Sequence, residues 1–239
     1  MFVVAAVVIA ALAIRTAVQT FVWRDTNTLF THVLKVNPQS VAAYTNLAVD
    51  AAEQDRPDDA IRLAFKALHL RPNNVQALTT LGSQEARLGR LDLAEEAYRR
   101  AVQLAPWDAN PLSNLAGLLA ERGKIDQALS MARRATELDP ELAQARANYG
   151  AILANTGRAD EALRQLELAA RLDPSDAGAG MNYALLLARA GRTREAVDQL
   201  RRILAVHPDH SPARTLLGEL STPADRPLDP SPGSPPHVR

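Results

Sequence analysis

The chain of 239 residues contains no cysteine, few aromatic residues and no excess charge. The absence of cysteine excludes disulfides, thiolate metal sites and cysteine nucleophiles. Aromatic residues make up 4% of the chain and hydrophobic residues 47%, so alanine and leucine supply much of the apolar content, and both favour helices. Lys+Arg 27 balances Asp+Glu 27, so no net field favours nucleic acid as a partner.

Proline supplies the strongest pattern in the sequence. Six prolines follow one another at intervals of 34 residues: Pro38, Pro72, Pro106, Pro140, Pro174 and Pro208. Five identical intervals do not arise by chance, so the chain contains internal repeats. The register defines five full repeats: 41–74, 75–108, 109–142, 143–176 and 177–210.

Small residues keep the same register. The eighth position of each repeat is Ala or Gly, and the twentieth is always Ala. Near the fifteenth position a "GR", "GK" or "DR" pair interrupts the apolar pattern, as the end of a helix followed by a turn does. Each repeat is therefore predicted to form two antiparallel helices, with the proline ending the second. The small residues mark where the helices approach closely, so a larger side chain there would overpack the contact.

This pattern resembles the tetratricopeptide repeat (TPR), and the resemblance covers residues 41–210. It implies an all-α fold, a right-handed superhelix or α-solenoid of five repeats with half-repeats at its ends. The family's large aromatic residue at the fourth position is kept only as Tyr44. We expect its replacement to weaken local packing in the last two repeats, where Arg146 and Gly180 stand.

Partial repeats flank the five full ones. Residues 24–40 are predicted to form an adaptor half-repeat, a second helix with Phe30, Val33 and Val36 at core positions. Residues 211–220 resemble one more first helix, which would cap the apolar end of the array. Residues 221–239 contain six prolines and are predicted to be a disordered tail.

A hydrophobic segment, residues 1–23, stands where the adaptor's partner helix is expected. Residues 1–14 carry no charge, Arg15 interrupts, and apolar residues resume through Trp23. A membrane span needs about 20 apolar residues, so the segment spans only if Arg15 reaches the interface. The small residues at 11–13 would instead suit a cleaved signal peptide, although a basic n-region is missing. In a third interpretation, the chain begins inside the last span of a larger membrane protein.

The junction after this segment, "WRD" followed by a Leu-Phe helix, "NP" and "Y.NLA", resembles that of membrane proteins with C-terminal TPR arrays. These include multi-spanning O-mannosyltransferase-like proteins. The resemblance implies a membrane anchor and an extracytoplasmic array. The flanking Arg15 and Arg24 favour a cytoplasmic array instead, by the positive-inside rule, and cleavage of a signal peptide would give an exported, soluble protein.

Catalytic motifs are lacking in the sequence. The five histidines have no zinc-protease or deaminase spacing, and the pair His207 and His210 supplies too few ligands for a metal. The sequence has no glycine-rich phosphate loop and no serine elbow. We therefore expect no enzyme activity, no catalytic residue, no metal and no cofactor.

A row of polar residues at the sixth position is the candidate binding site. In TPR arrays the first helices line the inner groove, so the resemblance implies that this row follows the groove. An asparagine amide offers a donor and an acceptor, which matches a peptide backbone; alternatively it buttresses neighbouring helices. Charged residues at the thirteenth position would add specificity. The predicted groove residues are Asn46, Thr80, Asn114, Asn148 and Asn182 in the row, with Glu53, Arg87, Glu121 and Arg189 beside it.

Two functions remain open at this point. The first is a membrane-tethered scaffold that binds an extended peptide or a partner protein in the groove. The second is the C-terminal TPR arm of a membrane-embedded glycosyltransferase-like protein, which would require hydrophobic spans encoded upstream of Met1. The sequence names neither the partner nor the oligomeric state.

Overall fold

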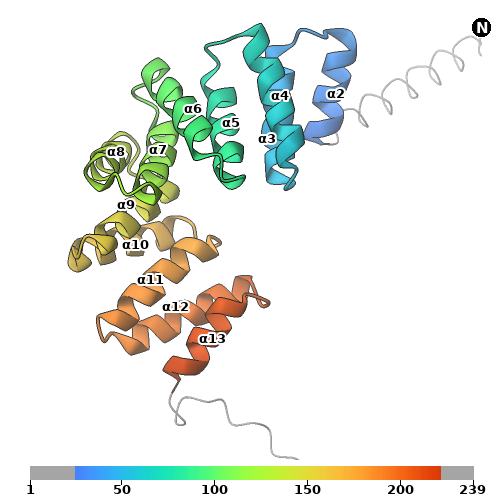
Figure 1. Cartoon of the computed structure of the whole chain (residues 1–239). Coiled ribbons are helices and arrows are strands. Elements are labelled where there is room, and N and C mark those ends of the chain that lie inside the picture. Colours follow the sequence, from blue (N-terminus) through green and yellow to red (C-terminus); the bar gives the residue numbers. More distant parts are fainter. Residues whose placement is uncertain (1–24, 222–239) are drawn as a thin grey trace, which may run out of the picture. The chain divides into compact units, whose positions relative to one another are not determined.

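The computed structural model describes residues 25–221, which form an all-α array of twelve helices (Figure 1). The predicted membrane segment, residues 1–23, lies outside the described residues, as does the predicted tail beyond residue 221. Between residues 25 and 221, every helix is too short or too polar to cross a membrane.

Each 34-residue repeat contains an A helix followed by a B helix. The A helices are α3 (Val41–Glu53), α5 (Val75–Arg87), α7 (Ala109–Glu121), α9 (Ala143–Asn155) and α11 (Ala177–Arg189). The B helices are α4 (Pro57–Leu70), α6 (Leu91–Leu104), α8 (Ile125–Leu138), α10 (Ala159–Leu172) and α12 (Thr193–Val206). Helix α2 (Thr26–Val36) precedes the repeats and α13 (Ser211–Leu220) follows them.

Local sequence explains where these helices begin and turn. Most A helices are preceded by a residue whose side chain accepts a hydrogen bond from a backbone amide of the first turn. Asn74, for example, accepts from the Ala77 amide at 2.9 Å. In four repeats the turn between the A and B helices uses glycine at a positive φ, as at Gly123 (φ 73°). The first repeat has Asp55 there instead, at φ 56°, a backbone conformation that costs a residue with a Cβ about 1–2 kcal/mol.

The helices form two compact units, residues 25–140 and 141–221. In the first unit the A helix α5 contacts both α3 and α7. Each B helix packs against the A helix of its own repeat, and α4 and α6 also pack against the next A helix. The core there is rich in alanine and includes Ala48, Ala64, Leu81 and Ala97. Such small side chains let the helix backbones approach closely.

In the second unit α9 and α11 contact each other, and α13 packs on α12. The core at this end contains Ala184, Leu200 and Ala213. Leu216 and Leu217 of α13 pack against the same cluster. Helix α13 therefore covers apolar surface of the last full repeat.

The small residues at the eighth position lie where the two helices of a repeat meet. A Cβ added at Gly82 would lie 2.8 Å from Cδ1 of Tyr98, and one at Gly150 would lie 2.7 Å from Cγ of Leu166. Real Cβ atoms essentially never approach so closely, so Tyr98 and Leu166 as placed here each require glycine opposite them. The fifth repeat shows that this is not a general rule, because Ala184 is at its eighth position although Leu200 is at the matching B-helix position. Where the B helix has alanine, as at Ala64, the eighth position is alanine too, as at Ala48.

Packing in the fifth repeat differs from our expectation. Gly180 replaces a large side chain, but Ile203 of α12 fills the space: its Cγ1 would lie 3.0 Å from a Cβ at Gly180. Ile203 is 2% exposed and stands where the other four repeats have alanine. In the fifth repeat the large side chain therefore comes from the B helix and not from the A helix. It fills the space next to Gly180 that we expected to be poorly packed.

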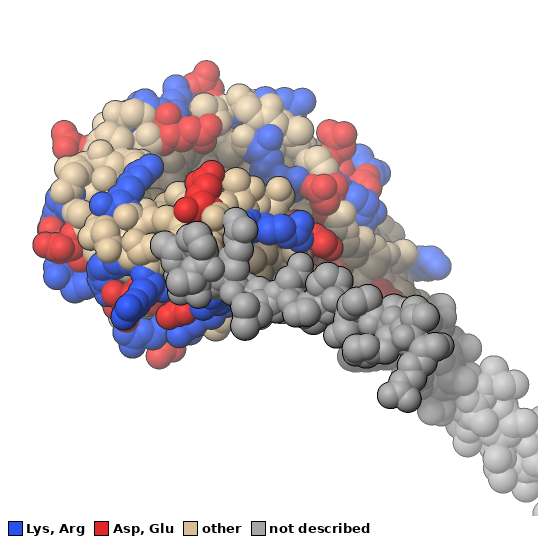
Figure 2. Space-filling model, turned by 90° about the horizontal axis from the view of Figure 1, so that it is seen from below, with Lys and Arg blue, Asp and Glu red and all other residues tan. Residues whose placement is uncertain are grey.

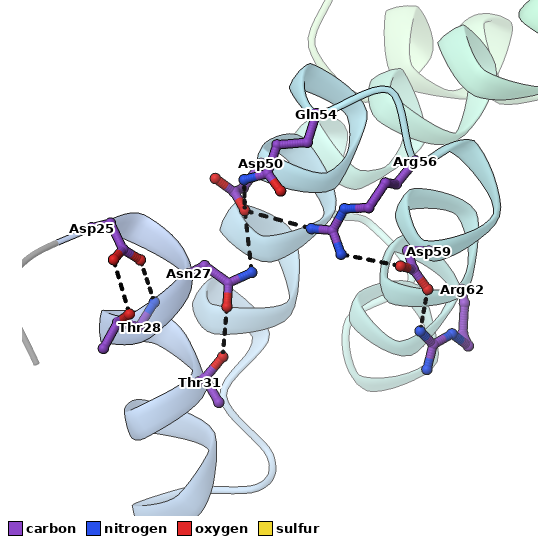
Figure 3. Close-up of polar contacts among 9 residues, drawn as sticks. All are labelled: Asp25, Asn27, Thr28, Thr31, Asp50, Gln54, Arg56, Asp59 and Arg62. Atoms are coloured by element: carbon purple, nitrogen blue, oxygen red, sulfur yellow. Dashed lines mark hydrogen bonds and ion pairs between the residues drawn. The ribbon is translucent and has the colours of Figure 1, made fainter.

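Helix α2 has a polar contact with the first repeat through Asn27 (Figure 3). The Asn27 amide donates to the Asp50 carboxylate at 3.4 Å, and Asp50 also accepts from Gln54 at 2.9 Å. The prediction that Val36 is a core residue was wrong, because its side chain is 76% exposed. Phe30 and Val33 are only half-buried.

Glu95 of α6 connects the second repeat to the third. Its side chain is 11% exposed, and its carboxylate contacts Arg99, Arg122 and Lys124 at 2.8–2.9 Å. Burial raises the pKa of this carboxyl, but hydrogen bonds from Lys124 and Arg99 outweigh it and hold the pKa below its ordinary value. Glu95 is therefore a charged link between neighbouring repeats.

We expect Glu95→Gln to lower the free energy of unfolding by about 1.5–3 kcal/mol, because it removes charge-assisted hydrogen bonds. Since the folded pKa is lowered, the wild-type contribution is fully present above the unfolded pKa and is lost as the pH falls from there through the lower folded pKa. Urea unfolding between pH 3 and 7 measures both effects. Glu96→Gln is the matched control on the same helix, since Glu96 is exposed. An equal loss in both variants would contradict the assignment.

Candidate functional site

The A helices of the first unit enclose a groove of about 470 Å³, which we name the A-helix groove. Helices α3, α5 and α7 supply most of its walls, and its lining is mainly amide, hydroxyl and charged side chains. The lining residues are Val49, Ala52, Glu53, Gln76, Thr79, Thr80, Ser83, Gln84, Arg87, Asp108, Asn110 and Asn114.

Four of the predicted groove residues meet in this groove: Glu53, Thr80, Arg87 and Asn114. Asn46 is outside the lining, because its Nδ2 donates to the Ala42 carbonyl of its own helix at 2.8 Å. Glu121, at the end of α7, is exposed and is also outside the lining.

The other three predicted residues belong to the second unit. Asn148 lies on α9, where its Oδ1 accepts a hydrogen bond from Gln144 at 3.1 Å. Asn182 and Arg189 lie on α11 and are exposed. The row is thus present on the A helices of both units, and the A-helix groove contains its two members from the second and third repeats.

Two deeply buried polar side chains on α5 line the groove. Thr80 is 6% exposed and Gln84 is 3% exposed. Gln84 Oε1 accepts from Arg87 Nη1 at 3.2 Å, which leaves its Nε2 group available to a ligand. Within residues 25–221 the Thr80 hydroxyl has no hydrogen-bond partner, and neither does the Asn114 amide. The groove therefore presents donors and acceptors whose hydrogen-bonding capacity is unused.

Charges of both signs stand at the edges of the groove. Arg87 forms an ion pair with Asp55, the residue with the strained turn conformation. Asp108 caps α7 by accepting from the Asn110 amide at 3.0 Å. Glu53 is exposed at the end of α3. The same guanidinium also donates to Gln84, so Arg87 links the turn at Asp55 to the groove wall on α5.

The sequence analysis missed five uncharged polar groove residues, and Asp108 as well. Gln76 and Asn110 occupy the second position of their repeats, one helical turn before the sixth, so spacing of four along the helix would have identified them. Thr79, Ser83 and Gln84 flank the row on α5. Only the second repeat has so polar a face, which is why a search for a single repeated position did not reveal it.

Ser83 also joins the groove to the core beneath it. Burial raises the pKa of Tyr98 to about 12, against a side-chain hydrogen bond with Ser83 that lowers it. Tyr98 is the side chain that packs on Gly82. The groove wall on α5 is therefore held in place by the close contact of α5 with α6.

The two C-terminal histidines have structural contacts. His207 Nε2 lies 2.6 Å from the Ser175 carbonyl, and His210 Nδ1 accepts from the Ala213 amide at the start of α13. Over the described residues, no group of three or more His, Asp or Glu side chains is placed to hold a metal ion.

Acidic and basic side chains alternate on the face of the molecule drawn in Figure 2. Acidic and basic side chains also pair locally at the starts of B helices, as Arg158 does with Glu161 at 2.6 Å and Arg192 with Glu195 at 2.6 Å. Exposed pairs of this kind contribute little to stability. This face therefore resembles a solvated surface.

Four family models, all described as tetratricopeptide repeat, match residues 41–64, 73–141, 114–177 and 153–220. Together they cover nearly all of the helical array. The chain belongs to the tetratricopeptide repeat family. TPR arrays are protein-interaction scaffolds that bind peptides or proteins, and residues 41–220 form such an array.

Solved TPR structures share the fold. TTC0263, a thermophilic TPR protein of Thermus thermophilus, is 26% identical over 76% of this chain and 98% of its own, with a TM-score of 0.66. YrrB, described as a TPR protein with an unusual peptide-binding site, is 25% identical over 78% and 96%, with a TM-score of 0.52. The Cut9–Hcn1 hetero-tetramer of the APC/C aligns at 23% identity over 81% of this chain and 39% of the other, with a TM-score of 0.75. A search of curated protein sequences finds no match.

Proposed function

We propose that this TPR protein is a membrane-tethered scaffold that binds an extended peptide segment in the A-helix groove. The observation that carries the binding site is the set of free polar groups there: the Thr80 hydroxyl, the Gln84 Nε2 and the Asn114 amide. Among the described residues no fully buried side-chain N or O atom lacks a partner, so these three groups are open to the solvent of the groove, where a ligand can pair with them.

An extended peptide supplies those partners best. Its backbone N–H and C=O groups are unpaired along its length, whereas a helix satisfies its own. Amide side chains such as Asn114 can donate and accept at once, and so hold a backbone unit without reading its side chain. Binding is therefore sequence-tolerant in the centre of the groove, and Glu53 and Arg87 at the edges supply selectivity.

The double change Thr80→Val and Asn114→Ala is expected to weaken binding roughly 5- to 150-fold, because two hydrogen bonds of about 0.5–1.5 kcal/mol each are lost. The probe is a peptide enriched on the full chain from an unbiased display library of short linear peptides. Fluorescence polarisation measures its affinity for both forms.

Asn46→Ala is the matched control, since Asn46 belongs to the same row but lies outside the groove lining. It should leave the affinity unchanged. If the double variant loses thermal stability and keeps its affinity, the row is structural and the peptide site is wrong. If no enriched peptide depends on Thr80 and Asn114, the proposal also fails.

The membrane tether rests on residues 1–23, whose first 14 positions carry no charge. We expect the full-length chain to stay with the membrane fraction during alkaline extraction, because a hydrophobic anchor resists conditions that release peripheral proteins. Recovery of full-length chain in the soluble fraction would refute the tether. Recovery of a shortened soluble form would favour the signal-peptide interpretation, and protease protection in sealed vesicles would decide which side carries the array.

The array as an arm of a larger membrane glycosyltransferase-like protein is the second candidate. Its support is the junction "WRD…NP…Y.NLA", which resembles that of such proteins. In-frame hydrophobic spans encoded upstream of Met1 would favour it. A stop codon directly upstream would rule it out.

A further inference from the structure

The first unit has a second, larger groove of about 740 Å³ between the B helices α4 and α6, which we name the B-helix groove. Leu78 and Leu81 of α5 line it and are buried. Phe65 on α4 and Leu93 on α6 also line it, although they are 54% and 51% exposed. The volume lies within the range of about 300–1,000 Å³ that ligand pockets occupy.

The other repeats serve as an internal comparison for these two side chains. At the position of Phe65, the four later repeats have Arg99, Arg133, Glu167 and Arg201. At the position of Leu93, the others have Asp59, Gln127, Glu161 and Glu195. Packing of the array therefore does not require large apolar side chains at either position. Phe65 and Leu93, the two apolar replacements, line the same groove. They are therefore a feature of this groove and not a requirement of the fold.

The lining of the B-helix groove differs in kind from that of the A-helix groove. Among the described residues its lining has no Asn, Gln, Ser or Thr side chain, and its polar groups are those of Tyr44, His69 and the charged side chains. An extended segment here would bury backbone N–H and C=O groups against apolar side chains, which is costly without partners. A helix satisfies its own backbone and needs only an apolar stripe, so the occupant of this groove is helical.

The charged side chains of the groove favour an acidic occupant. Lys66 lies over the Tyr44 ring at 5.4 Å, and Arg100 donates to the Pro72 carbonyl at 2.9 Å; within residues 25–221 neither has a carboxylate partner. Of the two acidic side chains in the lining, Glu85 is already paired with Arg90 at 3.2 Å. Two cations therefore face one unpaired carboxylate, that of Glu96.

We propose that the B-helix groove is a second docking site, which takes an amphipathic helix of a partner protein with large apolar residues on one face and acidic residues beside them. Phe65 and Leu93 contact the apolar stripe from both walls. Lys66 and Arg100 bind the flanking carboxylates. The site is separate from the A-helix groove, so the scaffold can hold two different kinds of segment.

Two display libraries of peptides about four turns long test this on the full chain. One places Leu or Phe at i, i+3, i+7 and i+10 with Glu beside them, and the other has the same composition with the apolar residues scattered over all faces. We expect only the first to yield binders. Phe65→Ser and Leu93→Ser should each weaken those binders about tenfold or more, since each removes a large buried contact.

Trp107→Ser is the matched control, because Trp107 is 71% exposed in the same unit and lies outside the groove; it should bind like the wild type. Lys66→Glu should weaken the same binders, and exchanging their Glu for Lys should restore binding to that variant. This charge exchange decides the matter even if Phe65→Ser impairs folding.

Several results would overturn the proposal. Equal enrichment from both libraries would mean unspecific hydrophobic binding. Binders that depend on Thr80 and Asn114 would lie in the other groove. Self-association of the full chain in sedimentation that Phe65→Ser abolishes would mean that a second copy occupies the groove. Binding that appears only after deletion of residues 1–23 would mean that the chain's own hydrophobic segment does.

Discussion

Gly82→Ala is expected to destabilise the wild-type chain and to stabilise the Tyr98→Ala variant. In the wild type the new methyl group would lie 2.8 Å from the Tyr98 ring, which is 4% exposed and has nowhere to move. Overpacking of this kind costs about 1–3 kcal/mol. In the Tyr98→Ala background the ring is gone, and replacing a glycine within a helix by alanine stabilises it by about 1 kcal/mol.

Tyr98→Ala alone should cost about 3–5 kcal/mol, as removal of a large buried aromatic side chain does. Chemical denaturation of the four forms gives the interaction energy between the two sites. Gly218→Ala is the control for helix propensity, because a Cβ there meets no atom within 4 Å. It should stabilise both backgrounds equally. If Gly82→Ala has the same sign in both backgrounds, the contact does not explain the glycine.

Ile203→Ala is expected to lower the free energy of unfolding by about 2–5 kcal/mol, the usual range for such a change in a core. Ile203 occupies the space that the fourth-position side chain fills in other repeats, so its loss leaves a cavity next to Gly180. Adding Gly180→Leu should recover much of the loss. The double variant then has the arrangement of the second and third repeats, where Leu78 and Leu112 pair with alanine at the position of Ile203.

Gly180→Leu in the wild type supplies the missing comparison. It should destabilise, because its side chain would meet Ile203 Cγ1 and Gln199 Nε2 at about 3 Å. Thermal unfolding followed by circular dichroism measures all four forms. A double variant less stable than Ile203→Ala would show that the two positions do not exchange volume.

Much of the fold follows from the sequence because the repeats restate one pattern. Prolines and small residues at fixed positions predict helix pairs, and each pair is formed by local contacts. The exchange between Gly180 and Ile203 was not predicted, because it joins two helices. Reading the fourth position alone shows a loss of volume, whereas the compensating gain lies 23 residues later.

That the row binds a ligand stays a prediction, but the structure shows which of its members line a groove. Thr80 lies on α5, which contacts both α3 and α7, and Asn114 lies on α7, which contacts α5; both line the A-helix groove. Asn46 lies on the first A helix and bonds to the carbonyl one turn before it, a local contact that competes with any ligand. The neighbouring side chains, and not the residue type, therefore decide which members of the row are available.

The start of helix α9 has a consequence for how the array opens. Other A helices begin at a polar side chain, whereas α9 follows Leu142, which offers no such bond; the Ala145 amide bonds instead to the Leu142 carbonyl at 3.1 Å. Loss of a side-chain cap costs a helix about 1 kcal/mol. The first turn of α9 should therefore fray most readily and exchange its amide hydrogens with solvent ahead of the other A helices. Among the A helices, the leucine that stands in place of a cap thus makes the start of α9 the expected first point of local opening.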